Sequence, residues 1–232
     1  MMLEVRSRII VHLAALLAAA QAEPAQAQSS VREFELGGSA HVLGPDCIRL
    51  TPDLPFLSGS AWFRRPVDLS RAFEVRLSLV LGEKDQAGAD GIVFVLHPEP
   101  GTGYRGEGMG FAGLVPSLGV EFDTYRNLHL QDPEADHVAL MADGESFHGR
   151  RGLGLVELPN LEDGSRHPLR ITWEPEIQRL TVALDGKVLG TVPGAVLERI
   201  FEGQTRLFWG FTAATGRLSN DQDICLETFL SV

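Results

Sequence analysis

The sequence predicts an all-β fold in which two antiparallel sheets pack against each other as a sandwich. Short runs of apolar or alternating residues follow one another along the chain, and Gly, Pro, Asp and Asn separate them. Such runs, at the spacing of tight turns, are typical of antiparallel sandwiches. Helical periodicity is nearly absent, because only 195–201 has the pattern of one or two helical turns. No internal repeat and no linker indicates a second domain.

The predicted strands differ in how they are buried. The run 72–81 alternates apolar and polar residues, as a half-buried strand does, whereas 91–96 is apolar throughout and predicts a strand buried on both faces. The segment 101–113 is rich in glycine and predicts a shaped loop between strands. In chain order the predicted strands are 42–43, 47–50, 72–81, 91–96, 120–125, 137–140, 169–173, 180–184, 207–212 and 224–230, with a hairpin between 169–173 and 180–184 and a tight turn at Asp185-Gly186.

The first 27 residues are predicted to be a secretory signal peptide. Two arginines precede the apolar run 9–20, and Ala20-Gln21-Ala22 and Ala25-Gln26-Ala27 both have the small-x-small pattern of cleavage sites. The apolar run is too short to cross a bilayer, and no later segment is apolar enough. The remaining domain, 28–232, is therefore expected to be secreted or periplasmic.

The formal net charge of −11 argues against two classes of partner. The predicted signal peptide carries two acidic and two basic residues, so its removal leaves this charge unchanged. An acidic domain without a basic stripe argues against binding to nucleic acid or to anionic membranes.

Cys47 and Cys225 are the two cysteines of the chain. In an exported protein such a pair is compatible with a disulfide. Two small buried hydrophobic side chains are an equally good interpretation, because the sequence does not show whether the two strands meet.

Polar side chains gather between residues 120 and 137. Glu121 and Asp123 project from the same face of the predicted strand, because side chains alternate along a strand. The loop that follows supplies Asn127 and Asp132, and His137 begins the next apolar run. Carboxylates this close repel each other unless a cation lies among them. Oxygen donors with one imidazole suit calcium together with manganese or a similar ion.

Four motifs, in this order along the chain, resemble those of the L-type (legume-like) lectin family, including its bacterial members. The resemblance covers about 34–229 and implies a concanavalin-like jelly roll, with a flat back sheet, a curved front sheet, and loops on the concave side that bind metals and sugar. The motifs are Ala89-Asp90-Gly91, Gly108-Met109-Gly110-Phe111, 120–127 with Asp132 and His137, and 210–216.

The resemblance implies two neighbouring metal ions. Glu121, Asp123, Asp132 and His137 would bind the transition metal. Calcium would be bound by Asp123, Asp132, the side chain of Asn127 and the backbone carbonyl of Tyr125. Asp123 and Asp132 would then bridge the two ions.

The resemblance also implies a sugar site built on the calcium. Asp90, which follows a cis peptide bond in the family, would accept hydrogen bonds from two sugar hydroxyls, and Asn127 would donate to one of them. The ring of Tyr125 would cover an apolar face of the sugar, and a backbone N–H at Glu107 or Gly108 would complete the set. Convergent polar groups beside an aromatic ring are what sugar recognition requires.

The sequence departs from the family pattern in two places. Gly106-Glu107-Gly108 differs from the loops of some legume lectins, which leaves the backbone donor open. Arg217 and Leu218, in the loop that sets specificity, differ from the common plant residues, so a preference for mannose or glucose does not follow. Arg217 would admit an acidic or larger glycan, or would be a solvated loop charge. The resemblance also allows a homodimer through the back sheet.

Three functions are compatible with these features. The favoured function is a non-catalytic, calcium- and manganese-dependent carbohydrate-binding protein whose partner is a glycan or glycoconjugate. A glycoside hydrolase on the same fold is disfavoured, because such enzymes carry another glutamate soon after the aspartate, where this chain has Tyr125, Arg126 and Asn127. A lectin-like domain that binds a protein partner is the third. The other histidines of the mature chain lack ligand spacing and are expected at loops or strand ends: His41, His97, His129, His148 and His167.

Overall fold

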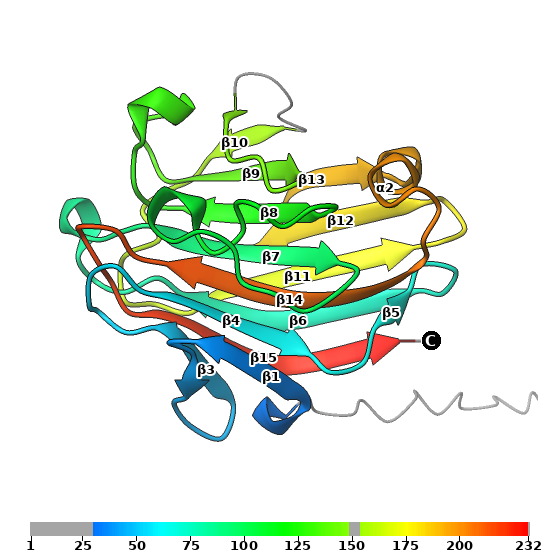
Figure 1. Cartoon of the computed structure of the whole chain (residues 1–232), viewed down its shortest axis with the longest axis horizontal. Helices are drawn as coiled ribbons and strands as arrows, with labels where there is room; N and C mark the ends of the chain where they lie inside the picture. Colours follow the sequence, from blue (N-terminus) through cyan, green and yellow to red (C-terminus); the bar gives the residue numbers. More distant parts are fainter. Residues whose placement is uncertain (1–29, 149–153, 232) are drawn as a thin grey trace, which may run out of the picture.

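Two antiparallel sheets face each other across a shared hydrophobic core (Figure 1). The computed structural model describes residues 30–148 and 154–231, so the predicted signal peptide and its cleavage site lie outside the described residues. The predicted all-β class and antiparallel pairing are confirmed.

Within the described residues, the front sheet has eight strands and the back sheet seven. The front sheet runs in the order β1 (Phe34–Gly38), β4 (Ser58–Phe63), β14 (Arg206–Ala214), β7 (Gly91–His97), β8 (Leu118–Asp123), β9 (His137–Ala142) and β10 (Leu155–Glu157), and β5 (Val67–Asp68) also pairs with β14. The back sheet runs β13 (Lys187–Pro193), β12 (Arg179–Leu184), β11 (His167–Glu174), β6 (Phe73–Val80), β15 (Gln222–Ser231), β3 (Cys47–Thr51) and β2 (His41–Val42).

The described helices are short. The helix predicted at 195–201 is confirmed as α2 (Gly194–Phe201), which buries Leu197, Ile200 and Phe201. The others are single 3-10 turns: η1 (Val31–Glu33), η2 (Asp85–Ala87), η3 (Gly106–Gly108) and η4 (Leu128–Leu130). Among the residues that the structure describes, none of the helices combines the length and apolar character that crossing a membrane would require.

Every strand predicted from the sequence is present, but some strands were missed. β1, β4, β5, β10 and β13 did not stand out from the sequence. β4, β5, β10 and β13 pair with strands that did, and β1 pairs with β4. β8 also ends at Asp123, two residues before the predicted end. The reason is that the N–H of Tyr125 donates to Asp123 Oδ1 at 2.7 Å instead of to a neighbouring strand.

At β7, both faces of the front sheet are buried. Ile92, Phe94 and Leu96 face the core between the sheets, as the apolar run predicts. Val93 and Val95 face the other side, where they pack in a second cluster with Trp62, Met109, Phe111 and Met141. Two members of this cluster come from the glycine-rich segment 101–113, so this loop is packed onto the concave face of the sheet.

A glycine in β8 makes room for that loop. A Cβ atom at Gly119 would lie 2.7 Å from the ring of Phe111, a distance too short for a real contact. The side chain of Phe111 therefore anchors the loop against bare backbone. The tryptophans Trp62, Trp173 and Trp209 are buried, as predicted.

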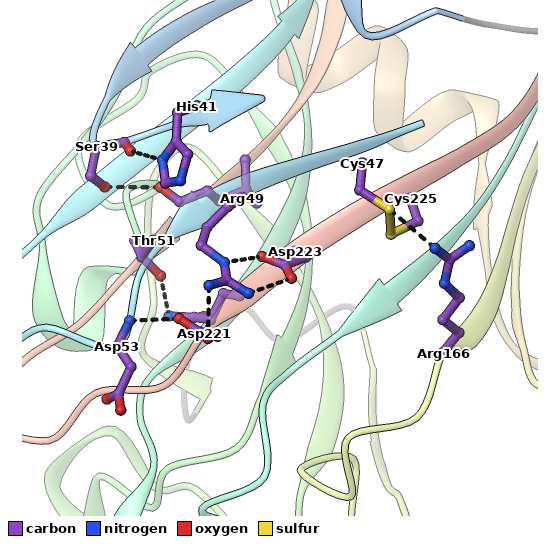
Figure 2. Close-up of polar contacts among 12 residues, drawn as sticks. Ser39, His41, Cys47, Arg49, Thr51, Asp53, Arg166, Asp221, Asp223 and Cys225 are labelled. Atoms are coloured by element: carbon purple, nitrogen blue, oxygen red, sulfur yellow. Dashed lines mark hydrogen bonds and ion pairs between the residues drawn. A yellow bond between two sulfur atoms is a disulfide. The ribbon is translucent and has the colours of Figure 1, made fainter. Parts of the chain in front are cut away.

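A disulfide joins Cys47 and Cys225, which the sequence had left open. These residues lie directly opposite each other in β3 and β15 (Figure 2). The guanidinium of Arg166 lies against the bridge, with Nη2 3.2 Å from the sulfur of Cys47. The bond closes a loop with a sequence separation of 178 residues, so it restricts most of the unfolded chain.

Replacing both cysteines, as Cys47→Ser with Cys225→Ser, is expected to lower the free energy of unfolding by about 2–5 kcal/mol, because the unfolded chain regains the entropy of the open loop. Denaturant unfolding measures this change. The native strand pairing does not require the bridge, so the variant should keep its β-sheet circular dichroism. A double variant as stable as the parent would contradict the prediction.

Candidate metal and ligand site

Strand register brings the ends of four front-sheet strands into one row. Ala214 of β14 pairs with Gly91 of β7, Gly91 pairs with Asp123 of β8, and Asp123 pairs with His137 of β9. In Figure 1, β14 and β8 end and β7 and β9 begin on the same side of the front sheet, at the left of the view. The loops that continue from this row, at residues 90, 124 and 215, therefore lie close together.

Three carboxylates are buried beside this row. Glu121 is completely buried, and Asp123 and Asp132 are nearly so. Burial raises the pKa of Asp123 well above its ordinary value, and the charges of Glu121 and Asp132 raise it further. Buried carboxylates so close together are normally paired with cations. The cluster is therefore a candidate cation site.

Two overlapping groups in this cluster have their donor atoms within 4.8 Å of one another. One is Asp123, Asp132 and His137, and the other is Glu121, His137 and His148. Together they contain every side chain predicted for the transition metal. His148 was expected only at a loop or strand end because it lacks ligand spacing in the sequence, but its ring lies within this second group. His148 follows the last residue of β9 by six positions. The segment between them folds back, so that His148 lies beside His137 at the start of β9.

His148 lies among the predicted ligands. Its Nε2 is 3.0 Å from Glu121 Oε1, 3.1 Å from Asp132 Oδ1 and 3.3 Å from His137 Nε2. Burial lowers the pKa of His148, but its hydrogen bonds with Asp132 and Glu121, and their charges, outweigh this and raise the pKa to about 9. In the absence of a metal, the His148 imidazolium thus balances part of the carboxylate charge.

The loop between Asp123 and Asp132 is folded by its two aspartates. Tyr125 N–H donates to Asp123 Oδ1 at 2.7 Å, and Asn127 N–H donates to Asp132 Oδ2 at 2.6 Å. The side-chain oxygen of Asn127 is buried and accepts no hydrogen bond from the described residues. These are the oxygen donors that a calcium ion takes.

Asp90 lies at the start of β7, next to this loop. Its peptide bond with Ala89 is cis, as predicted, and its backbone carbonyl accepts from Thr124 N–H at 3.0 Å. The side chain is 4% exposed, and its Oδ2 accepts no hydrogen bond from the described part of the chain. Burial, and then the charge of Glu107, raises the pKa of Asp90 to about 7, against a hydrogen bond from the Gly216 backbone.

Glycines frame the Asp90 carboxylate. A Cβ atom at Gly216 would lie 3.4 Å from Asp90 Oδ2 and 3.7 Å from the Cα atom of Gly106. The loop after β14 and the loop that holds η3 therefore converge on Asp90. Gly108 is buried in η3, while Arg217 is exposed and Leu218 half-buried on the loop beyond Gly216.

The side chain of Glu107 reaches toward the same place. Its Oε2 accepts from Asn127 Nδ2 at 3.4 Å and lies 2.9 Å from His129 Nε2. From the sequence, only the backbone N–H of Glu107 was expected at the site. The structure adds a second carboxylate next to Asp90.

Two aromatic side chains are exposed around the site. Tyr125 is 36% exposed and is therefore not part of the core. Phe56, which the sequence did not single out, is 57% exposed. Its N–H donates to the carbonyl of Gly216 at 2.9 Å, and its own carbonyl accepts from Arg105 Nη1 at 2.9 Å. A polar centre with exposed rings at its edge is suited to an amphipathic ligand.

Gln222, at the start of β15 in the back sheet, holds the segment before Asp90 by hydrogen bonds. Its Nε2 donates to the carbonyls of Ala214 at 2.8 Å and Ala89 at 3.4 Å, and to Thr51 Oγ1 at 2.8 Å. The neighbours of Gln222 are held in turn by Arg49, which lies 2.8 Å from both Asp221 Oδ2 and Asp223 Oδ1 (Figure 2). The back sheet thus positions the loops of the front sheet.

Glu162 forms a second buried support. Its Oε1 accepts from Asn220 Nδ2 at 2.8 Å, and a Cβ atom at Gly88 would lie 1.8 Å from that same oxygen. Burial raises the pKa of Glu162 to about 7, although the Asn220 hydrogen bond opposes the rise. Gly88 therefore allows the Asp90 loop to lie directly on a buried carboxyl group.

The chain matches the family described as the legume lectin beta-barrel domain over residues 25–228. Among curated proteins, the L-type lectin-domain containing receptor kinase VII.1 of Arabidopsis thaliana is 31% identical over 163 residues, which are 60% of this chain. The chain spans 23% of that protein's length.

Solved lectin structures share the fold. The lectin from Bauhinia forficata in complex with GalNAc is 20% identical, with a TM-score of 0.73, 88% of this chain covered and 94% of that one. The basic winged bean lectin with Tn-antigen is 23% identical, with a TM-score of 0.71 and coverage of 89% and 95%. The predicted jelly-roll sandwich is thereby confirmed.

Replacing Glu162 with Gln is expected to make the protein more stable at pH 8 than the parent, with little difference at pH 4. A carboxyl group whose pKa is raised on folding stabilises the fold below its unfolded pKa of about 4.3, and that contribution is lost as the pH rises through about 7. The neutral amide avoids the loss, so the gain at pH 8 should be about 1–3 kcal/mol.

Denaturant titrations of both proteins from pH 4 to pH 8, at one fixed calcium concentration, measure this difference. Titration of the other carboxyl groups cancels between parent and variant. A constant difference across the range would contradict the assigned ionisation of Glu162.

Proposed function

The chain belongs to the family of the legume lectin beta-barrel domain, and from this premise we propose that it is a non-catalytic carbohydrate-binding protein that depends on bound metals. The observation that carries the proposal is the convergence of Asp90, Asn127 and Gly216 beside a buried carboxylate cluster. The alternatives, a hydrolase and a protein-binding domain, do not explain why the acceptor at Asp90 is buried without a partner.

The residues present fit two cations. Calcium would be held by Asp123, Asp132, Asn127 Oδ1 and the carbonyl of Tyr125, and the buried, unpartnered oxygen of Asn127 supports this assignment. Glu121, Asp123, Asp132 and His137 would hold manganese or another transition metal. The bound cations would neutralise the buried carboxylates and fix the loop that carries Tyr125 and Asn127.

The proposed sugar lies against Asp90. Asp90 would accept from two hydroxyls, Asn127 Nδ2 and the N–H of Gly108 would donate, and Tyr125 and Phe56 would contact C–H surface. Because Glu107 places a second carboxylate at this position, we infer a neutral hexose rather than an acidic sugar. GalNAc and galactose, named with two of the similar structures, are therefore suitable first probes.

The geometry gives little support to hydrolysis. Glu121 is completely buried and lies 3.0 Å from His148, so it is not available as an acid or nucleophile toward a sugar. A turnover assay on β-glucans checks this, and hydrolysis that survives chelation would exclude the proposal.

The proposed location is outside the cytoplasm, either secreted or periplasmic. The disulfide supports it, because such bonds persist in oxidising compartments. A homodimer through the back sheet remains a prediction, which sedimentation of the mature chain would test.

Asp90→Asn is expected to weaken sugar binding by about 10- to 100-fold, because it removes a charged acceptor of two hydrogen bonds. Titration calorimetry with the tightest-binding sugar of a glycan array measures the change. The matched control is Asp185→Asn, since Asp185 also precedes a glycine but lies in the turn between β12 and β13 of the back sheet. Equal binding by the Asp90 variant and the parent would place recognition elsewhere.

Removing metals with a chelator is expected to abolish sugar binding and to lower thermal stability. Calcium at a hundredfold excess over its Kd should add about 3 kcal/mol to the free energy of unfolding, which is about 5–10 °C in Tm for a chain of this size. Differential scanning calorimetry with calcium, with chelator, and after calcium is restored measures the effect. Superimposable melting curves would count against the cation site.

A further inference from the structure

His148 is the one residue of the described cation cluster that the family pattern did not supply. Resting on the proposed metal-dependent function, we propose that His148 is a direct ligand of the transition metal, beside His137 and Glu121. The second imidazole would increase the preference of this position for zinc over manganese.

The distances around His148 match those of atoms that share one metal. Two ligand atoms that each lie about 2.1 Å from the same ion are about 3.0 Å apart at a right angle and about 3.4 Å apart at a tetrahedral angle. His148 Nε2 is 3.0 Å from Glu121 Oε1, 3.1 Å from Asp132 Oδ1 and 3.3 Å from His137 Nε2. All three distances fall in this interval.

Hydrogen bonding alone does not account for this convergence. A ring nitrogen carries at most one hydrogen and makes one well-directed bond. Here three electron-rich atoms, among them a second imidazole nitrogen, surround a single Nε2 atom. Glu121, His137 and His148 form one group of mutually close donors, in which His137 Nε2 and Glu121 Oε1 are 3.7 Å apart, so one cation would satisfy these three atoms at once.

The surroundings of His148 also suit a buried metal ligand. Its side chain is 8% exposed, and its ring meets that of His137 at 87°, with the ring centres 5.2 Å apart. Glu121 Oε2 is buried beside them and accepts no hydrogen bond from the described residues. A bound cation would provide the missing partner for this carboxylate.

The donor set predicts which metal is preferred. Imidazole nitrogen favours zinc, nickel and copper, whereas carboxylate oxygen suits manganese and calcium. With one histidine, a site of three carboxylates would remain oxygen-rich. With His137 and His148 together, zinc becomes the better match, while the oxygen donors of the neighbouring loop still suit calcium.

The test uses the mature chain with saturating calcium and compares the parent with His148→Ala, His148→Glu and His41→Ala. His41 is exposed on β2 of the back sheet and serves as the matched control. Titration calorimetry gives the affinities for zinc and manganese, and the visible absorption of bound cobalt reports nitrogen ligation. Circular dichroism and calcium binding show that each variant is folded.

The proposal expects His148→Ala to lose at least about tenfold in zinc affinity, with a smaller loss for manganese and an altered cobalt spectrum. His148→Glu, which returns an oxygen donor, should retain manganese affinity while the ratio of zinc to manganese affinity falls. His41→Ala should match the parent in every measurement.

Other outcomes overturn the proposal in distinguishable ways. An unchanged zinc-to-manganese ratio and an unchanged cobalt spectrum in His148→Ala would show that His148 is only a counter-ion to the carboxylates. The cation site of the proposed function would survive that result. Failure of the parent chain to bind any transition metal would overturn both this inference and the two-metal part of the proposed function.

Discussion

The burial of three carboxylates at one end of the front sheet is the constraint on which the site depends. Glu121, Asp123 and Asp132 are removed from water, and their mutual repulsion is large at short range in a weakly polar interior. Strand register leaves little freedom to separate them, because Asp123 is fixed between Gly91 and His137. The repulsion is therefore relieved by a proton on Asp123, whose pKa is raised, by protonated His148 or by a bound metal.

The same charge arrangement connects the cation cluster with the loops around Asp90. Asp123 and Asp132 accept hydrogen bonds from the loop that carries Tyr125 and Asn127. Thr124, which follows Asp123 in the chain, donates its N–H to the carbonyl of Asp90. Hydrogen bonds to the backbone thus join the cation cluster to the segment that carries Asp90. From the other side, Gln222 and the segment around it hold Ala89 and Ala214, so the Asp90 loop is clamped between the two sheets.

The fold class and the strands with clear apolar runs followed from the sequence, because their signals are local. The acidic residues near His137 were also visible there, whereas their assignment to two metals came from the family resemblance and stays a prediction. β1, β4, β5, β10 and β13 were missed because their residues form no clear apolar or alternating run, and pairing with other strands positions them. His148 lies outside the ligand spacing of the motif, and only the fold of the segment after β9 brings it to Glu121. Phe56 is likewise distant in sequence, and the hydrogen bond from its N–H to the carbonyl of Gly216 places it at the site.

Glu107 changes how selectivity at this site should be understood. The sequence left two interpretations of Arg217, contact with an acidic or larger glycan or a solvated loop charge, and the structure leaves Arg217 exposed. The Glu107 carboxylate accepts from Asn127, and its charge raises the pKa of Asp90. A negatively charged ligand at Asp90 would therefore be repelled by two carboxylates, and like charges at short range cost several kcal/mol. A neutral sugar instead gains a second acceptor for its hydroxyls. Selection at this position is therefore governed by the carboxylate pair more than by the cation on the loop.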